Sequence, residues 1–195
     1  MRVDNLSVEP IEIPRSLISI GTYSPIRTTM AHILVAYTTK KGTTKEIAEA
    51  IGKELTAAGH RADVLGVLSV PSLAGYDGVV IGGPMYMGRM VSDVGKFVRR
   101  QGEGLAKLPV AGFIVGLTPV KKDPESMAWM EKALYSALAP LKPVAAGMFA
   151  GRLDPSGLSW FQKWITKNVK SPEGDFRDWT AIAAWARELP GKMGI

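Results

Sequence analysis

The sequence predicts an α/β fold in which a five-stranded parallel sheet carries helices on both faces, a doubly wound three-layer sandwich. The main observation is that short apolar runs alternate along the chain with segments of helical periodicity, because strands separated by helices pair in parallel. The composition agrees, since 46% hydrophobic and 22% charged residues are ordinary values for a globular protein. With 195 residues, the chain has room for one domain and little more.

The expected strands are short and apolar, as in sheets that are covered on both faces. The first, AHILVAY, is rich in branched residues, and the third, GVVIG, follows a turn that contains Gly75. In chain order the five expected strands cover residues 31–37, 61–67, 78–82, 110–117 and 143–150.

The expected helices carry apolar residues at intervals of three and four. Gly59 ends the first helix, Pro140 follows the third, and Asp178 is well placed as the N-cap of the last. We expect Asp175 and Arg177 to join Asp178 in a local capping network. In chain order the four expected helices cover residues 43–58, 92–100, 126–138 and 178–189.

Two segments fall outside this alternation. Residues 1–29 contain three prolines and no sustained periodicity, which indicates an irregular N-terminal arm before a domain of residues 30–195. The second is an inserted segment, residues 152–175, that precedes the last helix.

The inserted segment predicts one extra amphipathic helix, because an apolar stripe recurs at helical spacing beside a basic face. Three placements stay open: residues 156–170 lie in a membrane interface, cover a ligand crevice, or form an ordinary surface helix. The residues concerned are Leu158, Phe161, Ile165 and Val169 in the stripe, Trp160 and Trp164 beside it, and Lys163, Lys167 and Lys170 on the basic face.

The composition excludes several kinds of site. The chain has no cysteine, which rules out disulfides, thiolate metal sites and cysteine nucleophiles. Its two histidines, His32 and His60, are too few for a site of several imidazoles, and we expect both to be structural or solvated and no metal to be bound. The formal charge of +6 favours an anionic partner, which could be nucleic acid, a phosphate-bearing cofactor or a lipid surface. The chain contains no run of about 18 apolar residues, so we expect no transmembrane helix.

Functional residues are expected in the loops after the first, third and fourth strands, because such sheets bind ligands at the carboxyl ends of their strands. The first of these loops offers hydroxyls, a glycine and backbone N–H groups at a helix N-terminus, which together favour a phosphate. A threonine hydroxyl that merely caps the helix is the alternative. The candidate phosphate-binding residues are Thr38, Thr39, Lys40, Lys41, Gly42, Thr43 and Thr44.

The loop after the third strand, residues 82–90, is rich in glycine and has Tyr86 and two methionines at its middle. Glycines let a backbone approach a flat ligand, and aromatic or thioether side chains can cover a ring face. A flexible turn with methionines in the core fits equally well. The loop after the fourth strand, residues 118–122, would border the same crevice.

These loops resemble those of flavodoxins. The segment TKKGTT (39–44) resembles the flavodoxin phosphate loop Ser/Thr-x-Thr-Gly-x-Thr, with a departure at Lys41, where flavodoxins usually have a hydroxyl. The segment GGPMYMGRM (82–90) is similar to the Gly-x-Pro-x-x-x-Gly-x-Met loop of flavodoxin-like quinone reductases. More narrowly, residues 30–189 resemble the menaquinone-dependent protoporphyrinogen dehydrogenases, in YTTKKGTT (37–44), YDGVVIG (76–82) and the Asp-Trp pair at 178–179.

The resemblance implies a flavodoxin-like sandwich that binds FMN noncovalently. Residues 39–44 would hold the phosphate, and Tyr86 is the residue that we expect to stack on the flavin ring. The resemblance names no catalytic acid or base. The residues implied around the ring are Pro84, Met85, Tyr86, Met87 and Gly88 on one side and Leu117, Thr118 and Pro119 on the other.

The implied function is that of an FMN-dependent oxidoreductase that passes electrons from a porphyrinogen-like or other organic donor to a quinone. Two alternatives stay open: a flavodoxin-type electron carrier without a substrate of its own, and a flavin-free binding domain on the same fold. We expect a cytoplasmic protein with no nucleic-acid partner, bound peripherally to the inner face of the cell membrane if residues 156–170 contact lipid.

Overall fold

The computed structural model describes residues 30–117, 123–153 and 174–195. The expected arm (1–29) and the expected amphipathic helix (156–170) therefore lie outside the described residues. The elements in chain order are β1 (His32–Tyr37), α1 (Thr43–Ala57), β2 (Arg61–Gly66), η2 (Val67–Ser69), β3 (Gly78–Tyr86), β4 (Arg89–Met90), α2 (Ser92–Arg100), α3 (Gly102–Leu105), β5 (Val110–Gly116), α4 (Pro124–Leu138), β6 (Ala145–Ala150), β7 (Arg152–Leu153), β8 (Gly174–Asp175) and α6 (Trp179–Met193).

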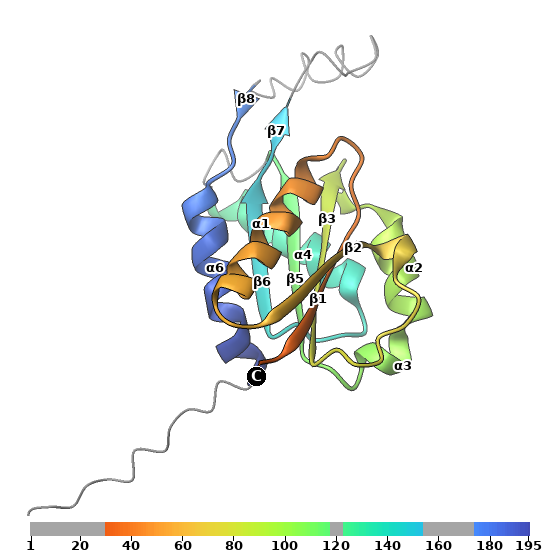
Figure 1. The fold of residues 1–195 in the computed structure, drawn as a ribbon. Helices are drawn as coiled ribbons and strands as arrows, with labels where there is room; N and C mark the ends of the chain where they lie inside the picture. Colours follow the sequence, from red (N-terminus) through yellow and green to blue (C-terminus); the bar gives the residue numbers. More distant parts are fainter. Residues whose placement is uncertain (1–29, 118–122, 154–173) are drawn as a thin grey trace, which may run out of the picture.

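The five expected parallel strands are present, in the order β2-β1-β3-β5-β6 (Figure 1). From β1 the chain runs outward to β2 at one edge of the sheet and then returns to β3 on the other side of β1. The strand order thus reverses between β1 and β3, which is the position where sheets of this kind bind ligands. One further short strand, β4, pairs antiparallel with the end of β3.

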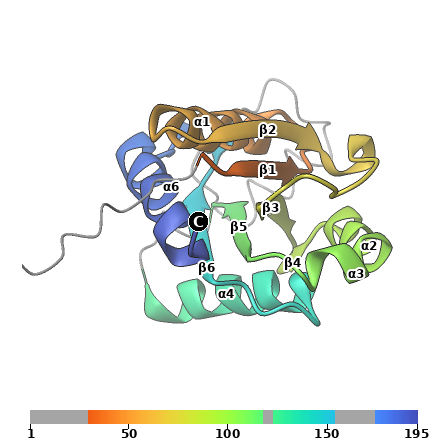
Figure 2. The ribbon, with the colours of Figure 1, turned by 60° about the horizontal axis from the view of Figure 1, so that its bottom comes forward.

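Helices cover both faces of the sheet, with α1 and α6 on one face and α2, α3 and α4 on the other (Figure 2). Each face has its own cluster of buried hydrophobic residues, and β1 contributes to both. Leu34 points into the cluster of α2 and α4, whereas Ile33 and Val35 point into the cluster of α1 and α6. Burial on both faces explains why the strands are apolar along their length.

Three aromatic rings lie at the centre of the face covered by α1 and α6. The ring centroid of Phe113 is 6.1 Å from that of Phe149 and 6.3 Å from that of Trp185. Phe113 of β5 is fully buried and stands opposite Gly82 of β3 in the sheet register. A Cβ at Gly82 would lie 2.0 Å from Phe113 Cζ, so the absence of a side chain there makes room for the ring.

The third strand is longer than the sequence predicted. It continues to Tyr86, whereas the prediction ended it at Gly82 and read the following residues as a loop. The prediction treated Gly83 and Pro84 as turn residues, but both continue the ladder beside β5. Gly83 serves close packing instead, because a Cβ there would lie 3.0 Å from Thr38 Cγ2.

Helix α4 begins at Pro124, two residues before the start at Ser126 that the sequence predicted for the third expected helix. Asp123 is its N-cap, and the Asp123 carboxylate accepts a hydrogen bond from Ser126 N at 2.8 Å. Proline suits the first position of a helix, because the N–H that it lacks has no partner within the helix.

The last helix, α6, starts as predicted and ends later. Asp178 is its N-cap, with the side chain accepting from Ala181 N at 2.9 Å, which confirms the expected cap. The prediction ended the helix at Leu189, but it passes through Pro190 in its last turn and is followed by Gly194 in the left-handed region (φ 73°). None of the helices in the described part of the chain is long and apolar enough to cross a membrane.

We expect Gly82→Ala to destabilise the fold, because the added methyl group overlaps the buried ring of Phe113. The expected loss is about 1–3 kcal/mol in the free energy of unfolding, measured by urea denaturation. Gly102→Ala is the matched control, since no atom lies within 4 Å of a Cβ at that helical position. Equal losses in the two variants would contradict the packing argument.

Candidate functional site

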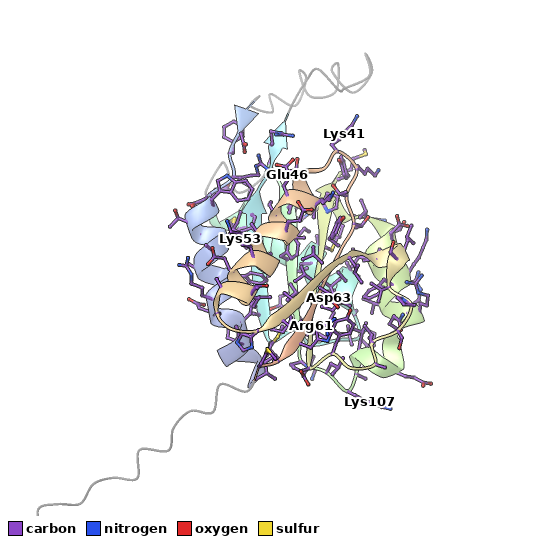
Figure 3. The ribbon with its side chains drawn as sticks, in the orientation of Figure 1. Lys41, Glu46, Lys53, Arg61, Asp63 and Lys107 are labelled. Atoms are coloured by element: carbon purple, nitrogen blue, oxygen red, sulfur yellow. The ribbon has the colours of Figure 1, made fainter. Side chains whose placement is uncertain are left out.

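The sheet register brings the predicted loops to one end of the molecule, which we call the carboxyl edge. β1 pairs with β3, and just beyond this ladder Thr38 N donates to Gly82 O at 3.0 Å. β3 pairs on its other side with β5. The chain therefore leaves β1, β3 and β5 at the same edge. Figure 3 shows Lys41 at this end of the molecule and Lys107 at the opposite end.

The loop after β1 turns into α1 through Gly42. This residue is the N-cap of α1 and adopts the left-handed backbone conformation that favours glycine (φ 88°). Thr39 Oγ1 accepts a hydrogen bond from Gly42 N at 3.0 Å, so the threonine hydroxyl helps to set the turn. Gly42 has no side chain with which to bond the first N–H groups of the helix. N–H groups at the positive end of a helix dipole can bind an anion, and we call those at the start of α1 the Gly42 cradle.

The other predicted residues of this loop differ in exposure. Thr44 is 2% exposed and packs inside the first turn of α1. Thr38 and Thr43 are half-buried, whereas Lys40 and Lys41 are exposed. The alternative that a threonine hydroxyl caps this helix is wrong, since the N-cap residue is a glycine.

Tyr86, at the end of β3, contacts the loop after β1. Lys40 Nζ lies 4.6 Å from the centre of the Tyr86 ring, a cation–π distance. Tyr86 is 43% exposed, and burial of the rest of the ring raises the pKa of its phenol above the usual value of 10.0. The phenol is therefore neutral near pH 7, and the lysine and the ring join two of the predicted loops.

Two residues, Met87 and Gly88, turn the chain from β3 into β4. Met87 has a positive φ of 46°, which is uncommon for a residue with a side chain, and is 98% exposed. Trp129 of α4 packs on the turn, because a Cβ at Gly88 would lie 2.1 Å from Trp129 Cζ2. Trp129 is 50% exposed. Sequence reasoning missed Trp129, since nothing near it in the sequence signals a contact with this turn.

The remaining residues predicted around a ring are less exposed or lie outside the described residues. Pro84 is buried in β3, and Met85 packs against the cluster of α2 and α4. Leu117 is half-buried directly after β5. Thr118 and Pro119 lie outside the described residues.

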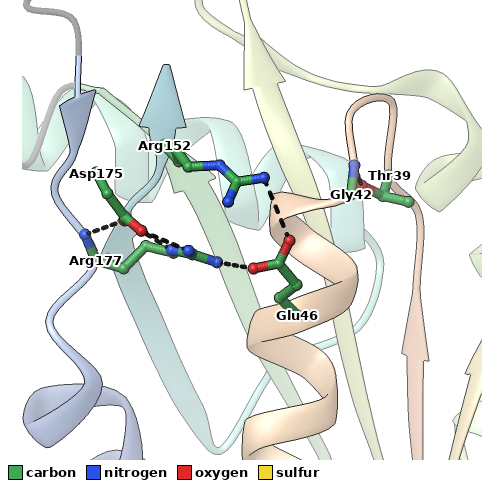
Figure 4. A network of polar contacts seen from close by, with 6 residues as sticks. All are labelled: Thr39, Gly42, Glu46, Arg152, Asp175 and Arg177. Atoms are coloured by element: carbon green, nitrogen blue, oxygen red, sulfur yellow. Dashed lines mark hydrogen bonds and ion pairs between the residues drawn. The ribbon is translucent and has the colours of Figure 1, made fainter. Parts of the chain in front are cut away.

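A polar network lies beside Gly42 at the start of α1 (Figure 4). Glu46, in the first turn of α1, accepts hydrogen bonds from Arg177 Nη1 and, at 3.5 Å, from Arg152 Nη2. Arg177 also donates to Asp175, from Nε at 2.7 Å and from Nη2 at 2.5 Å. Of the expected capping network, Asp175 and Arg177 bond each other, whereas Asp178 accepts from Ala181 N at the start of α6. Sequence reasoning missed Glu46 and Arg152, because 131 positions separate Glu46 from Arg177 and 106 positions separate it from Arg152.

Arg177 is held from several sides in this network. Its side chain is 5% exposed, and its guanidinium carbon lies 4.5 Å from the centre of the Trp179 ring. The hydrogen bond from Arg177 lowers the pKa of Asp175 to about 2, and the hydrogen bond to Asp175 raises the pKa of Arg177. Both groups are therefore charged near neutral pH.

The two histidines lie at the amino ends of the strands, away from the carboxyl edge. His32 begins β1, and its Nε2 is 2.8 Å from Asp63 Oδ2, to which Tyr76 Oη also donates at 2.9 Å. His60 is 5% exposed, and Ala31 N donates to its Nδ1 at 3.3 Å. Both rings are therefore held by contacts within the fold, and the expectation that neither is catalytic stays a prediction. Within the residues that the structure describes, no group of three or more histidines or carboxylates is placed to hold a metal ion.

Comparison with known proteins identifies the domain family. A family model described as a flavodoxin domain matches residues 34–180. The chain is 28% identical over 170 residues to a protein of Escherichia coli (strain K12) named protoporphyrinogen IX dehydrogenase [quinone], and the match covers 80% of this chain and 93% of that relative. The protein of the same name from Escherichia coli O157:H7 matches to the same extent.

Solved structures resemble the fold at lower identity. A crystal structure of Fusobacterium nucleatum flavodoxin bound to flavin mononucleotide has a TM-score of 0.53 and 14% identity, and the match covers 84% of this chain and 99% of that chain. A short-chain flavodoxin associated with a non-canonical PDU bacterial microcompartment gives the same values. These likenesses confirm the flavodoxin-like sandwich predicted from the sequence.

We expect the Asp175–Arg177 pair to stabilise the fold down to unusually low pH. The pKa of Asp175 is about 2 in the folded chain against an ordinary value of 3.8, so its contribution is complete above about pH 5 and is lost as the pH falls toward 2. Since the Asp175 side chain is 43% exposed, we expect Asp175→Asn to cost less than about 1 kcal/mol at neutral pH. Urea denaturation of both proteins across this range measures the difference, and a cost unchanged at pH 2 would contradict the assignment.

Proposed function

Since the chain belongs to the flavodoxin domain family, we propose that it is an FMN-dependent oxidoreductase. In this proposal it acts as a protoporphyrinogen dehydrogenase and passes electrons from a porphyrinogen-like donor to a quinone. The arrangement of the carboxyl edge supports the cofactor, and the relative named protoporphyrinogen IX dehydrogenase [quinone] supports the donor and the acceptor.

One observation carries the proposal: the Gly42 cradle and the turn of Met87 and Gly88 lie at the same edge of the sheet, joined by Lys40 over the ring of Tyr86. FMN combines a phosphate with a large planar ring. A cradle of helix N–H groups suits the phosphate, and an exposed aromatic and thioether surface suits the ring. The two halves of the site thus match the two halves of the ligand.

The residues of this chain supply binding and orientation in the proposal. The N–H groups at the start of α1 would hold the phosphate, with Thr39 keeping Gly42 in its left-handed turn and Thr43 adding a hydroxyl. Tyr86 would cover the ring as a neutral phenol, because burial raises its pKa. Bound FMN supplies transfer of one or two electrons. The proposal assigns no acid or base to the chain.

The donor and the acceptor are the finer part of the proposal. The match to the Escherichia coli dehydrogenase covers 93% of that relative, so nearly the whole length of a protein with this name has a counterpart here. A quinone acceptor is lipid-soluble, so a membrane contact by residues 156–170 would bring the protein close to its acceptor. That contact remains a prediction, since the segment lies outside the described residues.

We expect the purified protein to bind FMN and Gly42→Ala to weaken that binding by about fivefold to thirtyfold, because a side chain in the left-handed region costs about 1–2 kcal/mol. Titration of the apoprotein with FMN, followed by flavin fluorescence, measures the change. Gly59→Ala is the matched control, since Gly59 also has a positive φ (92°) but lies at the other end of α1. If both variants bind FMN as tightly as the wild type, the phosphate is held elsewhere.

We also expect the FMN-loaded protein to oxidise protoporphyrinogen with a quinone as acceptor. Porphyrin fluorescence measures turnover, and protein without FMN is the control. A protein that exchanges electrons with other proteins but never turns over protoporphyrinogen would favour the electron-carrier alternative. A protein that takes up no flavin at all would favour the flavin-free alternative.

A further inference from the structure

We propose that Arg177 is a positioning residue for the cofactor: it holds and neutralises the Glu46 carboxylate beside Gly42, so that the start of α1 accepts a phosphate dianion. This inference rests on the proposed function, in which the Gly42 cradle holds the phosphate of FMN. It adds a residue from the far end of the chain to a site that the sequence assigned to the loop of residues 38–44.

The carboxylate of Glu46 lies close to the cradle. A Cβ built on Gly42 would be 3.8 Å from Glu46 Oε1. A phosphate monoester carries close to two negative charges near neutral pH, so a bare carboxylate at this place would repel it. The helix dipole attracts both anions, and the carboxylate therefore competes with the phosphate for the same end of α1.

Two arginines offset the charge of this carboxylate. Arg177 Nη1 bonds Glu46 Oε2, and Arg152 Nη2 approaches Glu46 Oε1 at 3.5 Å (Figure 4). The neighbouring Lys45 instead pairs with Glu49, at 3.6 Å. Within the described residues, Glu46 thus forms ion pairs with these two arginines.

Arg177 is the firmer of the two partners. Its side chain is 5% exposed, against 38% for Arg152. Asp175 binds it from the other side and the ring of Trp179 lies 4.5 Å from its guanidinium, so its position is fixed independently of Glu46. The two arginines and the two carboxylates balance in charge. Loss of Arg177 leaves one net negative charge next to the cradle.

The experiment compares binding of FMN with binding of riboflavin, which has the same ring system but no phosphate. Both are titrated into apoprotein of the wild type, Arg177→Gln, Glu46→Gln and the double variant. We expect Arg177→Gln to weaken FMN binding about tenfold, because it removes the firmer counter-charge of the Glu46 carboxylate beside the phosphate, and to change riboflavin binding less than about twofold. We expect the double variant to regain most of the lost FMN affinity, since it lacks the repelling charge.

A purely structural role for Arg177 predicts a different pattern. Loosening of the junction between α1 and α6 would weaken FMN and riboflavin alike, and the double variant would be no better than Arg177→Gln alone. Either result would overturn the inference.

Matched variants control for folding and for general charge. Arg187 of α6 pairs with Glu54 of α1 at 2.8 Å, farther along the same helix pair, so Arg187→Gln should leave FMN affinity unchanged. Arg177→Lys keeps the charge but loses the forked hydrogen bonds to Asp175, so we expect its FMN affinity to lie between those of the wild type and Arg177→Gln. Lys and Gln variants that bind FMN equally tightly would contradict the charge argument. If the wild type itself binds riboflavin and FMN equally well, the phosphate site of the proposed function fails instead.

Discussion

The strand order β2-β1-β3-β5-β6 is the constraint on which the site depends. By sending β2 to the edge and bringing β3 back beside β1, the chain places the loops after these strands next to each other. This order requires central strands that are buried on both faces, and β1 meets the requirement with Ile33 and Leu34 fully buried in opposite clusters. Residues far apart in sequence, such as Lys40 and Tyr86, then meet without any segment adopting an unusual fold.

The two ends of the sheet differ in their electrostatics. At the amino ends of the strands, His32 and Tyr76 both hydrogen-bond to Asp63 and so join β1 to its neighbours. At the carboxyl edge, the start of α1 presents N–H groups and a positive dipole end. Glu46 is the acid within this first turn, and its ties to Arg152 and Arg177 connect α1 with β7 and with the residues that precede α6. The hydrogen bonds at the amino ends hold the strands together, whereas the groups at the carboxyl edge are of the kind that attract an anion.

Local patterns predicted most of the fold. Strands that are buried on both faces are apolar along their length, and helices that are buried on one side carry apolar residues at intervals of three and four. The local patterns failed where a distant partner decides the structure. Gly83 and Pro84 have the local chemistry of a turn, yet pairing with β5 keeps them in β3. The short elements η2, α3, β7 and β8 were missed because two to four residues are too few to show a period.

The candidate site divides in the same way. The turn at Gly42 was predictable from its own loop, since a glycine among hydroxyl residues at the start of a helix indicates a turn whose N–H groups can bind a phosphate. Trp129 and Glu46 were not, because their roles depend on Gly88 and Arg177, which only the fold brings near. A charge pair across 131 positions leaves no periodicity and no motif in a single sequence.

The claim that FMN binds at the carboxyl edge is tested most directly by following backbone amide signals by NMR as FMN is added to the isotope-labelled apoprotein. The account predicts that the largest shifts fall on Gly42, Thr43 and the turn at Met87 and Gly88, and that riboflavin shifts the turn but moves the signals of Gly42 and Thr43 far less. Shifts centred instead on the amino ends of the strands, around His32 and Tyr76, would contradict it.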